Sequence, residues 1–224
     1  RFKNVWNEKK LRFCPRHSDG SWECAVDPEL NTWLAQGGKF WTEGNEAQWR
    51  WFVPGDPAGL VALFPSPAKF VSELDKFMTE PHSNPSTFLP NGGYWAGNEP
   101  DILAPWLFNF AGRQDRTQYH TRWLMDHRYG LGGDGLPGND DFGTLSSWFA
   151  FAAMGLYPLT GSAGYIVGSP LFEKVVLPGR NATILAHNQS SSNVYVSSLS
   201  LNGVTLQGDE ARFISHAALQ GARL

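Results

Sequence analysis

The sequence predicts a mainly α-helical chain that ends in a β-rich region, and three observations predict it. Apolar residues recur at helical spacing between about residue 30 and residue 159, separated by loops rich in Gly, Pro and Asn. After Pro158 the apolar runs become short and β-branched, which is typical of strands. Between two of these runs lies Asn202-Gly203, a strong hairpin signal because both turn positions need positive φ. We therefore expect a helical region, 1–160, followed by a β-rich closing segment, 161–224.

The helical region should contain several packing helices. The segment from Pro67 to Thr79 begins with a proline, which suits a first helical turn, and it places Phe70, Leu74 and Phe77 on one face. The predicted helical ranges are 46–64, 67–79, 100–111, 114–129 and 140–156.

A small antiparallel sheet should follow the helices. The predicted strands are Tyr165–Gly168, Lys174–Leu177, Thr183–His187, Val194–Leu201, Val204–Gln207 and Arg212–Ser215.

Charge and hydropathy exclude several classes of partner. The formal charge is −3 and the pI is about 6.1, and no cluster of Lys and Arg is present, so we expect no nucleic-acid partner. The most apolar run, Trp148–Leu156, is roughly half of the length needed to cross a bilayer, so we expect no membrane partner. His and Cys do not occur at zinc-ligand spacing.

Secretion is the localisation that the sequence favours. Cys14 and Cys24 bracket a turn-like segment, so we predict a disulfide between them, with two free core thiols as the alternative. Two glycosylation sequons, at Asn181 and Asn188, also fit a secreted protein. The sequence opens at Arg1 without a signal-like segment, so we expect that any targeting signal lies upstream or has been removed.

Ten tryptophans are unusually many, and several lie in loops beside acidic residues. Flat aromatic faces suit the apolar C–H faces of a sugar ring, which makes Trp22, Trp41 and Trp95 candidate substrate-binding residues. The alternative is that these large side chains fill a helical core.

Three loops carry the polar residues most suited to chemistry. Glu43 follows two aromatic residues, and desolvation there would raise its pKa, as a general acid requires; a helix-start glutamate is the alternative. Asn98 and Glu99 offer hard oxygen ligands that suit calcium, although a capped helix start has the same pattern. Asp140 and Asp141 precede an apolar helix, where a carboxylate is held ionised, as a general base must be, although helix capping explains them equally well.

At these segments the sequence resembles glycoside hydrolase family 92, the calcium-dependent exo-α-mannosidases. The resemblance covers about residues 14–216, and its most specific part is the motif from Gly135 to Pro158. The carrying motifs are Asp19-Gly20-Ser21-Trp22, Thr42-Glu43-Gly44-Asn45, Phe52-Val53-Pro54, Asp56-Pro57-Ala58-Gly59-Leu60, Gly97-Asn98-Glu99-Pro100, Thr117-Gln118, Gly135-Leu136-Pro137-Gly138-Asn139-Asp140-Asp141, Met154-Gly155-Leu156-Tyr157-Pro158, Ile166-Val167-Gly168-Ser169-Pro170-Leu171-Phe172 and Leu201-Asn202-Gly203.

The resemblance implies an (α/α)₆ toroid paired with an N-terminal β-sandwich, of which this chain would hold the second half of the toroid and the closing sheet. By motif position Glu43 matches the general acid, Asp141 the general base and Asp140 a close companion. Asn98 and Glu99 fall in the segment near calcium, and Gly97 and Asn139 lie in motifs near the substrate. The implied partners are a mannose-containing oligosaccharide or N-glycan and the missing parts of the toroid and β-sandwich.

The implied activity is an inverting exo-α-mannosidase that releases terminal mannose. Ala96-Gly97 replaces the His-Glu pair of α-1,2-cleaving members, so linkage preference stays open. Gly55, Ala47 and the stretch 101–103 also depart from the family pattern. The alternatives are a hydrolase of another α-glycoside or of a mannosyl-phosphodiester, and a non-catalytic sugar-binding relative.

Overall fold

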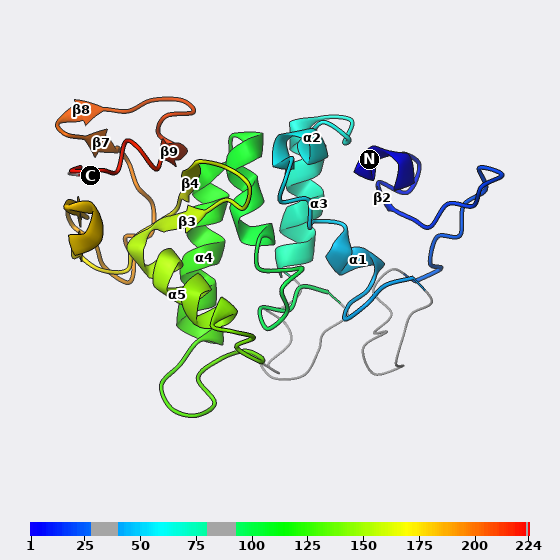
Figure 1. The fold of residues 1–224 in the computed structure, drawn as a ribbon, viewed down its shortest axis with the longest axis horizontal. Helices are drawn as coiled ribbons and strands as arrows, with labels where there is room; N and C mark the ends of the chain where they lie inside the picture. Colours follow the sequence, from blue (N-terminus) through cyan, green and yellow to red (C-terminus); the bar gives the residue numbers. More distant parts are fainter. Residues whose placement is uncertain (28–39, 80–92, 223) are drawn as a thin grey trace.

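The computed structural model describes residues 1–27, 40–79, 93–222 and 224 (Figure 1). Helices occupy the middle of the molecule, with the N-terminal segment at one end and the C-terminal β region at the other. No helix in these residues is long and apolar enough to cross a membrane. The α-helices of the described residues are α1 (Glu46–Trp49), α2 (Pro57–Val61), α3 (Pro67–Thr79), α4 (Gln114–Arg128) and α5 (Thr144–Met154), and their 3₁₀ helices are η1 (Phe2–Val5), η3 (Ala104–Ala111) and η4 (Pro178–Arg180).

Helix α3 has the predicted bounds. The Ser66 hydroxyl oxygen accepts the Lys69 backbone N–H at 3.1 Å, which caps the first turn. Phe70, Leu74 and Phe77 are buried, as their spacing predicts.

Other predicted helices are shorter than their apolar patterns. The range 46–64 divides into α1 and α2, because Asp56 caps a new helix by accepting the Gly59 N–H at 2.8 Å, with Pro57 at its first position. The range 100–111 forms only η3, from Ala104 onward. The range 140–156 begins its helix at Thr144, because the residues from Asp141 to Gly143 have positive φ.

The β region forms several small antiparallel sheets rather than the single sheet that the sequence predicts. β3 (Leu156–Pro158), β4 (Gly164–Val167) and β9 (Phe213–Ser215) make a three-stranded sheet in the order β3-β4-β9. Two two-stranded sheets pair β5 (Lys174–Leu177) with β6 (Ala182–Leu185) and β7 (Ser200–Leu201) with β8 (Val204–Thr205). A further two-stranded sheet, of β1 (Trp6–Asn7) and β2 (Arg12–Phe13), lies in the N-terminal segment.

The predicted hairpin at Asn202-Gly203 is confirmed, but its first strand is much shorter than predicted. Asn202 and Gly203 have φ of 52° and 82°, and they join β7 to β8. Only Ser200 and Leu201 of the range 194–201 are in a strand. The backbone N–H of Val196 is instead bound to the Gln118 side chain at 3.1 Å, so a helix takes the place of a strand partner.

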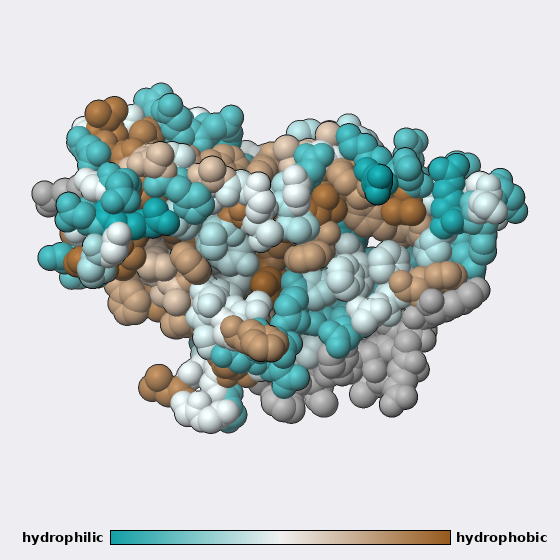
Figure 2. Space-filling model, in the orientation of Figure 1, coloured by the Kyte–Doolittle hydropathy of each residue, from teal (hydrophilic) through white to brown (hydrophobic). Residues whose placement is uncertain are grey.

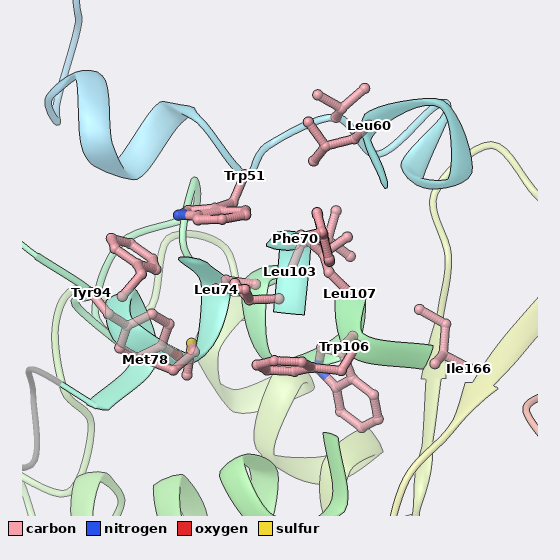
Figure 3. Close-up of a cluster of buried hydrophobic side chains, with 14 of the residues drawn as sticks. Trp51, Leu60, Phe70, Leu74, Met78, Tyr94, Leu103, Trp106, Leu107 and Ile166 are labelled. Carbon is pink, nitrogen blue, oxygen red and sulfur yellow. The ribbon is translucent and has the colours of Figure 1, made fainter. Parts of the chain in front are cut away.

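A large aromatic and aliphatic core fills the helical region. Trp51, Phe70 and Trp106 are fully buried in it and come from the turn after α1, from α3 and from η3 (Figure 3). Trp106 stacks on Tyr157 with 4.8 Å between ring centroids, which joins η3 to β3. Core packing is therefore the role of most of the described tryptophans. A second, smaller core lies in the β region around Leu156, Ile184 and Leu219.

Buried polar side chains fasten the helices to the β region. The Asn109 amide donates to the backbone carbonyl of Val167 at 2.9 Å, and the Arg122 guanidinium donates to those of Pro170 and Ser190 at 3.0 Å each. Asn109 and Arg122 are almost completely buried. The helical and β-rich regions are thus joined by hydrogen bonds through their shared interior.

Candidate active site

Three loops, each lying just before a helix, bring the candidate carboxylates together. The first, 40–45, precedes α1 and carries Glu43; the second, 93–103, precedes η3 and carries Glu99; the third, 130–143, precedes α5 and carries Asp141. The local reason is the same in each loop, because Gly, Pro and Asn interrupt the helical pattern directly before a new helix.

Two glycines let the second and third loops touch through their backbones. A Cβ atom at Gly97 would lie 2.3 Å from the carbonyl oxygen of Pro137, and one at Gly138 would lie 2.5 Å from the carbonyl oxygen of Gly97. Neither position has space for a side chain. Gly97 therefore packs against the third loop in this structure, and its role in substrate binding stays a prediction.

Asn98 ties the second loop to the first. Its side chain is 2% exposed, and its amide nitrogen donates a hydrogen bond to the backbone carbonyl of Glu43. Asn98 therefore holds the backbone that carries the predicted acid, and its amide oxygen is the atom that could coordinate a cation.

Glu99 and Asp141 are in direct contact. Burial raises the pKa of Glu99, and a hydrogen bond between its carboxyl group and that of Asp141 raises it further, as do the negative charges of Asp141 and Glu43. The Glu99 Oε1 atom is buried and has no hydrogen-bond partner among the described residues. A cation beside these two carboxyl groups would reduce the repulsion between them.

The two predicted catalytic carboxylates both have an uncommon backbone conformation. Glu43 has φ of 50° and Asp141 has φ of 43°, and both residues are exposed. Non-glycine residues adopt positive φ rarely, and such residues concentrate at active sites. After Asp141, the turn continues through Phe142 at 59° and Gly143 at 84°.

Asp140 has a different environment from its neighbour. Its carboxylate accepts the Ser146 backbone N–H and the Ser146 hydroxyl, both at 2.9 Å. It thereby caps the first turn of α5. Asn139, in the same loop, is exposed.

The three candidate tryptophans have different surroundings. Trp95 is 9% exposed, and its backbone N–H donates to Asp101 at 2.8 Å. Trp41 is partly buried against the helical core. Trp22 is 37% exposed, with the Arg16 guanidinium 4.9 Å from its ring. Trp22 is thus the most exposed of the three candidates.

The predicted disulfide is confirmed, since Cys14 and Cys24 are bonded. Glu46, in α1, holds both ends of the loop that this bond closes. It forms an ion pair with Arg12 and accepts the Ala25 backbone N–H at 2.9 Å. The two sulfurs and Glu46 lie close enough for a metal site, but the sulfurs are occupied in the disulfide.

The two sequons lie on the surface. Asn181 and Asn188 are exposed, with φ of 49° and 59°. Both residues are therefore accessible, and their glycosylation stays a prediction.

Known proteins of one family resemble this chain in sequence. Residues 1–224 match the family model described as "Glycosyl hydrolase family 92 catalytic domain". It is 32% identical over 203 residues to an uncharacterized secreted glycosidase of Arthroderma benhamiae, a match that covers 85% of this chain and 25% of that protein.

Solved structures are similar over almost the whole chain. A family 92 α-mannosidase of Bacteroides thetaiotaomicron, BT3965, is 29% identical, with a TM-score of 0.84, over 99% of this chain and 29% of that one. The inverting mannosidase BT2199 of the same organism is 28% identical, with a TM-score of 0.78, over 99% of this chain and 32% of that one. The chain therefore spans about a third or less of these relatives.

The fold is mainly helical, brings carboxylates together from three loops and is similar to the folds of these mannosidases. The chain belongs to glycosyl hydrolase family 92, and it is a C-terminal portion of that family's catalytic region.

Proposed function

We propose that the protein containing this chain is an inverting exo-α-mannosidase, with Glu43 as general acid and Asp141 as general base. The observation that carries the proposal is the convergence of Glu43, Glu99 and Asp141 from separate loops, in the positions that the family motifs assign to them. One of the similar structures is an inverting mannosidase, which supports the stereochemistry. The substrate would be a mannose-containing oligosaccharide or an N-glycan.

In an inverting glycosidase, two carboxyl groups act on opposite sides of the scissile bond. Asp141 would accept a proton from the attacking water while Glu43 gives a proton to the leaving oxygen. Both residues are exposed and held in turns of positive φ, so each carboxyl group is accessible to a bound sugar. Asp140 is bound to Ser146, which favours a structural rather than a proton-transferring role for this close companion.

The residues present fit a calcium ion. Carboxylate and amide oxygens are ligands that calcium prefers, and Glu99 Oε1 is buried without a hydrogen bond in the described part of the chain. Glu99 and Asn98 would hold the ion, whose charge would also relieve the repulsion between Glu99 and Asp141. Calcium bound there supplies positive charge that can orient sugar hydroxyls.

The remaining parts of the proposal concern the whole protein. We propose that residues 1–160 form the second half of an (α/α)₆ toroid and that residues 161–224 close it. The first half and an N-terminal β-sandwich would come from sequence outside this chain, which spans 29% of the BT3965 structure. Secretion is supported by the description of the Arthroderma benhamiae relative and by the confirmed disulfide.

The stereochemistry of the first product tests this function. Proton NMR during the first minutes of hydrolysis of an α-mannobiose, before mutarotation, should show β-mannose, because inversion of an α-mannoside yields the β anomer. A chelator should abolish the reaction, and added calcium should restore it. Initial α-mannose, or no release of mannose by the intact protein, would refute the proposal.

A further inference from the structure

Asp101 has a carboxyl group that the proposed mechanism does not use. It lies two residues after Glu99, in a segment whose oxygen-rich composition suits a metal, but its side chain is fully buried, at 0% exposure. Its Oδ2 atom accepts the backbone N–H of Trp95 at 2.8 Å. Its Oδ1 atom is buried and has no hydrogen-bond partner among the residues that the structure describes. Asp101 therefore faces the interior of its own loop.

The hydrogen bond to Trp95 closes a compact turn that runs from Trp95 to Asp101. Within the turn, the Asn98 N–H donates to the Trp95 carbonyl at 3.2 Å, and the Asp101 N–H donates to the Asn98 carbonyl at 3.0 Å. Each of these two backbone bonds spans half of the turn, whereas the Asp101 side chain spans the whole of it. It joins the two ends of the turn directly.

The residues inside this turn make the contacts that assemble the proposed site. Gly97 packs against the Pro137 backbone, Asn98 binds the Glu43 carbonyl, and Glu99 contacts the Asp141 carboxyl group. A change in the shape of the turn would therefore move Asn98 and Glu99 relative to both proposed catalytic carboxylates.

Burial of Asp101 has a cost that packing alone does not explain. The side chain is fully removed from water, and the Trp95 N–H compensates only one of its two carboxyl oxygens. A buried polar atom without a partner destabilises the folded state, whereas an apolar side chain of the same size would not. The acceptor for the Trp95 N–H is the property that an apolar side chain could not supply.

We infer that Asp101 is a positioning residue for the proposed active site, because it fixes the Trp95–Asp101 turn in the shape that places Glu99 beside Asp141 and Asn98 against Glu43. The inference rests on the proposed function. Asp101 touches neither the substrate nor the reacting atoms in this scheme; it acts through Asn98 and Glu99.

Substitutions of Asp101 in the intact, full-length protein test this inference. Asp101→Asn keeps an oxygen acceptor for the Trp95 N–H, Asp101→Ala removes it, and Asp101→Leu removes it while filling the space. Asp126→Ala, at an exposed position of α4, is the matched control. The measurements are calcium affinity by titration calorimetry on chelator-treated protein, kcat and KM on an α-mannobiose, and the melting temperature.

We expect the alanine and leucine variants to lose about 10- to 100-fold in calcium affinity and in kcat, the usual range for residues that orient a metal site. KM should change less than kcat. The asparagine variant should stay within about threefold of the wild type because it keeps the acceptor, and so should the control because Asp126 is an exposed residue outside the turn. The leucine variant decides the outcome if the alanine variant does not fold.

Wild-type calcium affinity and kcat in a folded alanine or leucine variant would overturn the inference alone. An asparagine variant as impaired as the leucine variant would also overturn it, because the Trp95 acceptor would then be irrelevant. A wild-type protein that neither binds calcium nor cleaves mannosides would overturn the proposed function, and this inference with it.

Discussion

Glu43 and Asp141 have the left-handed backbone conformation, although a glycine lies close to each of them in the sequence. Gly44 follows Glu43 directly, yet the positive φ falls on the glutamate; Gly143 lies two residues after Asp141 and shares the left-handed conformation with it. A side chain in this conformation costs free energy, and it persists only where surrounding contacts hold it. At Glu43 the contact is the Asn98 amide on its carbonyl, so the backbone of the proposed acid is fixed from another loop.

Gly97 supplies the first prediction at the residue scale. Gly97→Ala should lower the free energy of unfolding by about 1–3 kcal/mol, because its Cβ would lie 2.3 Å from a backbone oxygen of Pro137 that cannot move alone. It should also lower kcat, since the second and third loops would be pushed apart. Chemical denaturation and steady-state kinetics measure the two effects.

Gly133→Ala is the control for this prediction. Gly133 is in the third loop and has open space where a Cβ would lie. Equal stability and activity of the two alanine variants would show that the Gly97–Pro137 contact does not support the site.

At the scale of elements, each candidate carboxylate lies just before a helix, and capping separates the roles of the two adjacent aspartates. Asp140 accepts the backbone N–H of Ser146 in the first turn of α5, whereas Asp141 contacts Glu99. The sequence presents Asp140 and Asp141 as equivalent acids before an apolar helix. Only the turn that follows them directs one side chain to the helix and the other to the second loop.

A substitution at Asp140 tests this division. Asp140→Ala should lower the free energy of unfolding by about 0.5–2 kcal/mol, the usual effect of losing a helix cap, whereas Asp140→Asn should keep most of the stability. Asp141→Asn should leave stability nearly unchanged and reduce kcat. Thermal and chemical denaturation of the three variants give the comparison. If Asp140→Ala abolishes activity without loss of stability, Asp140 takes part in the chemistry rather than in capping.

The disulfide is a second element-scale feature with a measurable effect. Replacing Cys14 and Cys24 by serine should lower the free energy of unfolding by about 2–3 kcal/mol, the chain-entropy value for a loop of this size. Peptide mapping without reduction should recover the two cysteines in one linked peptide pair. Two alkylatable thiols in the native protein would contradict the assignment.

At the scale of the whole molecule, the chain exposes several large apolar side chains. Leu131 and Phe142 are fully exposed, and Figure 2 shows apolar groups on the surface, including one at the tip of the loop between α4 and α5. The chain spans 29% of the BT3965 structure, and we propose that polypeptide outside this chain covers these side chains.

This arrangement predicts that residues 1–224 alone are inactive. Expressed with the rest of the catalytic region as a separate chain, they should copurify with it and recover mannosidase activity. Size-exclusion chromatography and release of mannose measure assembly and activity. A monomeric, cooperatively melting and active 224-residue protein would contradict the prediction.

Local features could be predicted from the sequence, and contacts between distant segments could not. Helix α3 and the Asn202-Gly203 hairpin depend on neighbouring residues, and both match the prediction. The break between α1 and α2 is also local, because Asp56 and Pro57 begin a new helix there. The apolar pattern continues across this break, so a single helix was predicted. The range 194–199 has a strand-like pattern, yet the side chain that binds its Val196 N–H comes from α4.

The candidate site depends on such distant contacts. The Asn98 side chain reaches Glu43 across 55 residues, and Glu99 meets Asp141 from a separate loop. Family motifs indicated which carboxylates belong to the site, but no sequence spacing indicated that Glu99 and Asp141 touch. The glycines in both motifs were consistent with a close backbone contact such as that between Gly97 and Pro137. Glycine occurs for many other structural reasons, so this contact could not be predicted from it.

The most direct test of the central claim compares substrates with poor and good leaving groups. In Glu43→Gln, loss of a positioned acid should reduce kcat on an α-mannobiose by roughly 10²- to 10⁴-fold, and most of this loss should disappear with α-mannosyl fluoride, which needs no proton to leave. Asp141→Asn should be poor on both substrates, because the attacking water needs a base whatever group leaves. A Glu43→Gln variant equally impaired on fluoride and disaccharide, or an Asp141→Asn variant with full activity on either, would contradict the assignment of these two carboxylates.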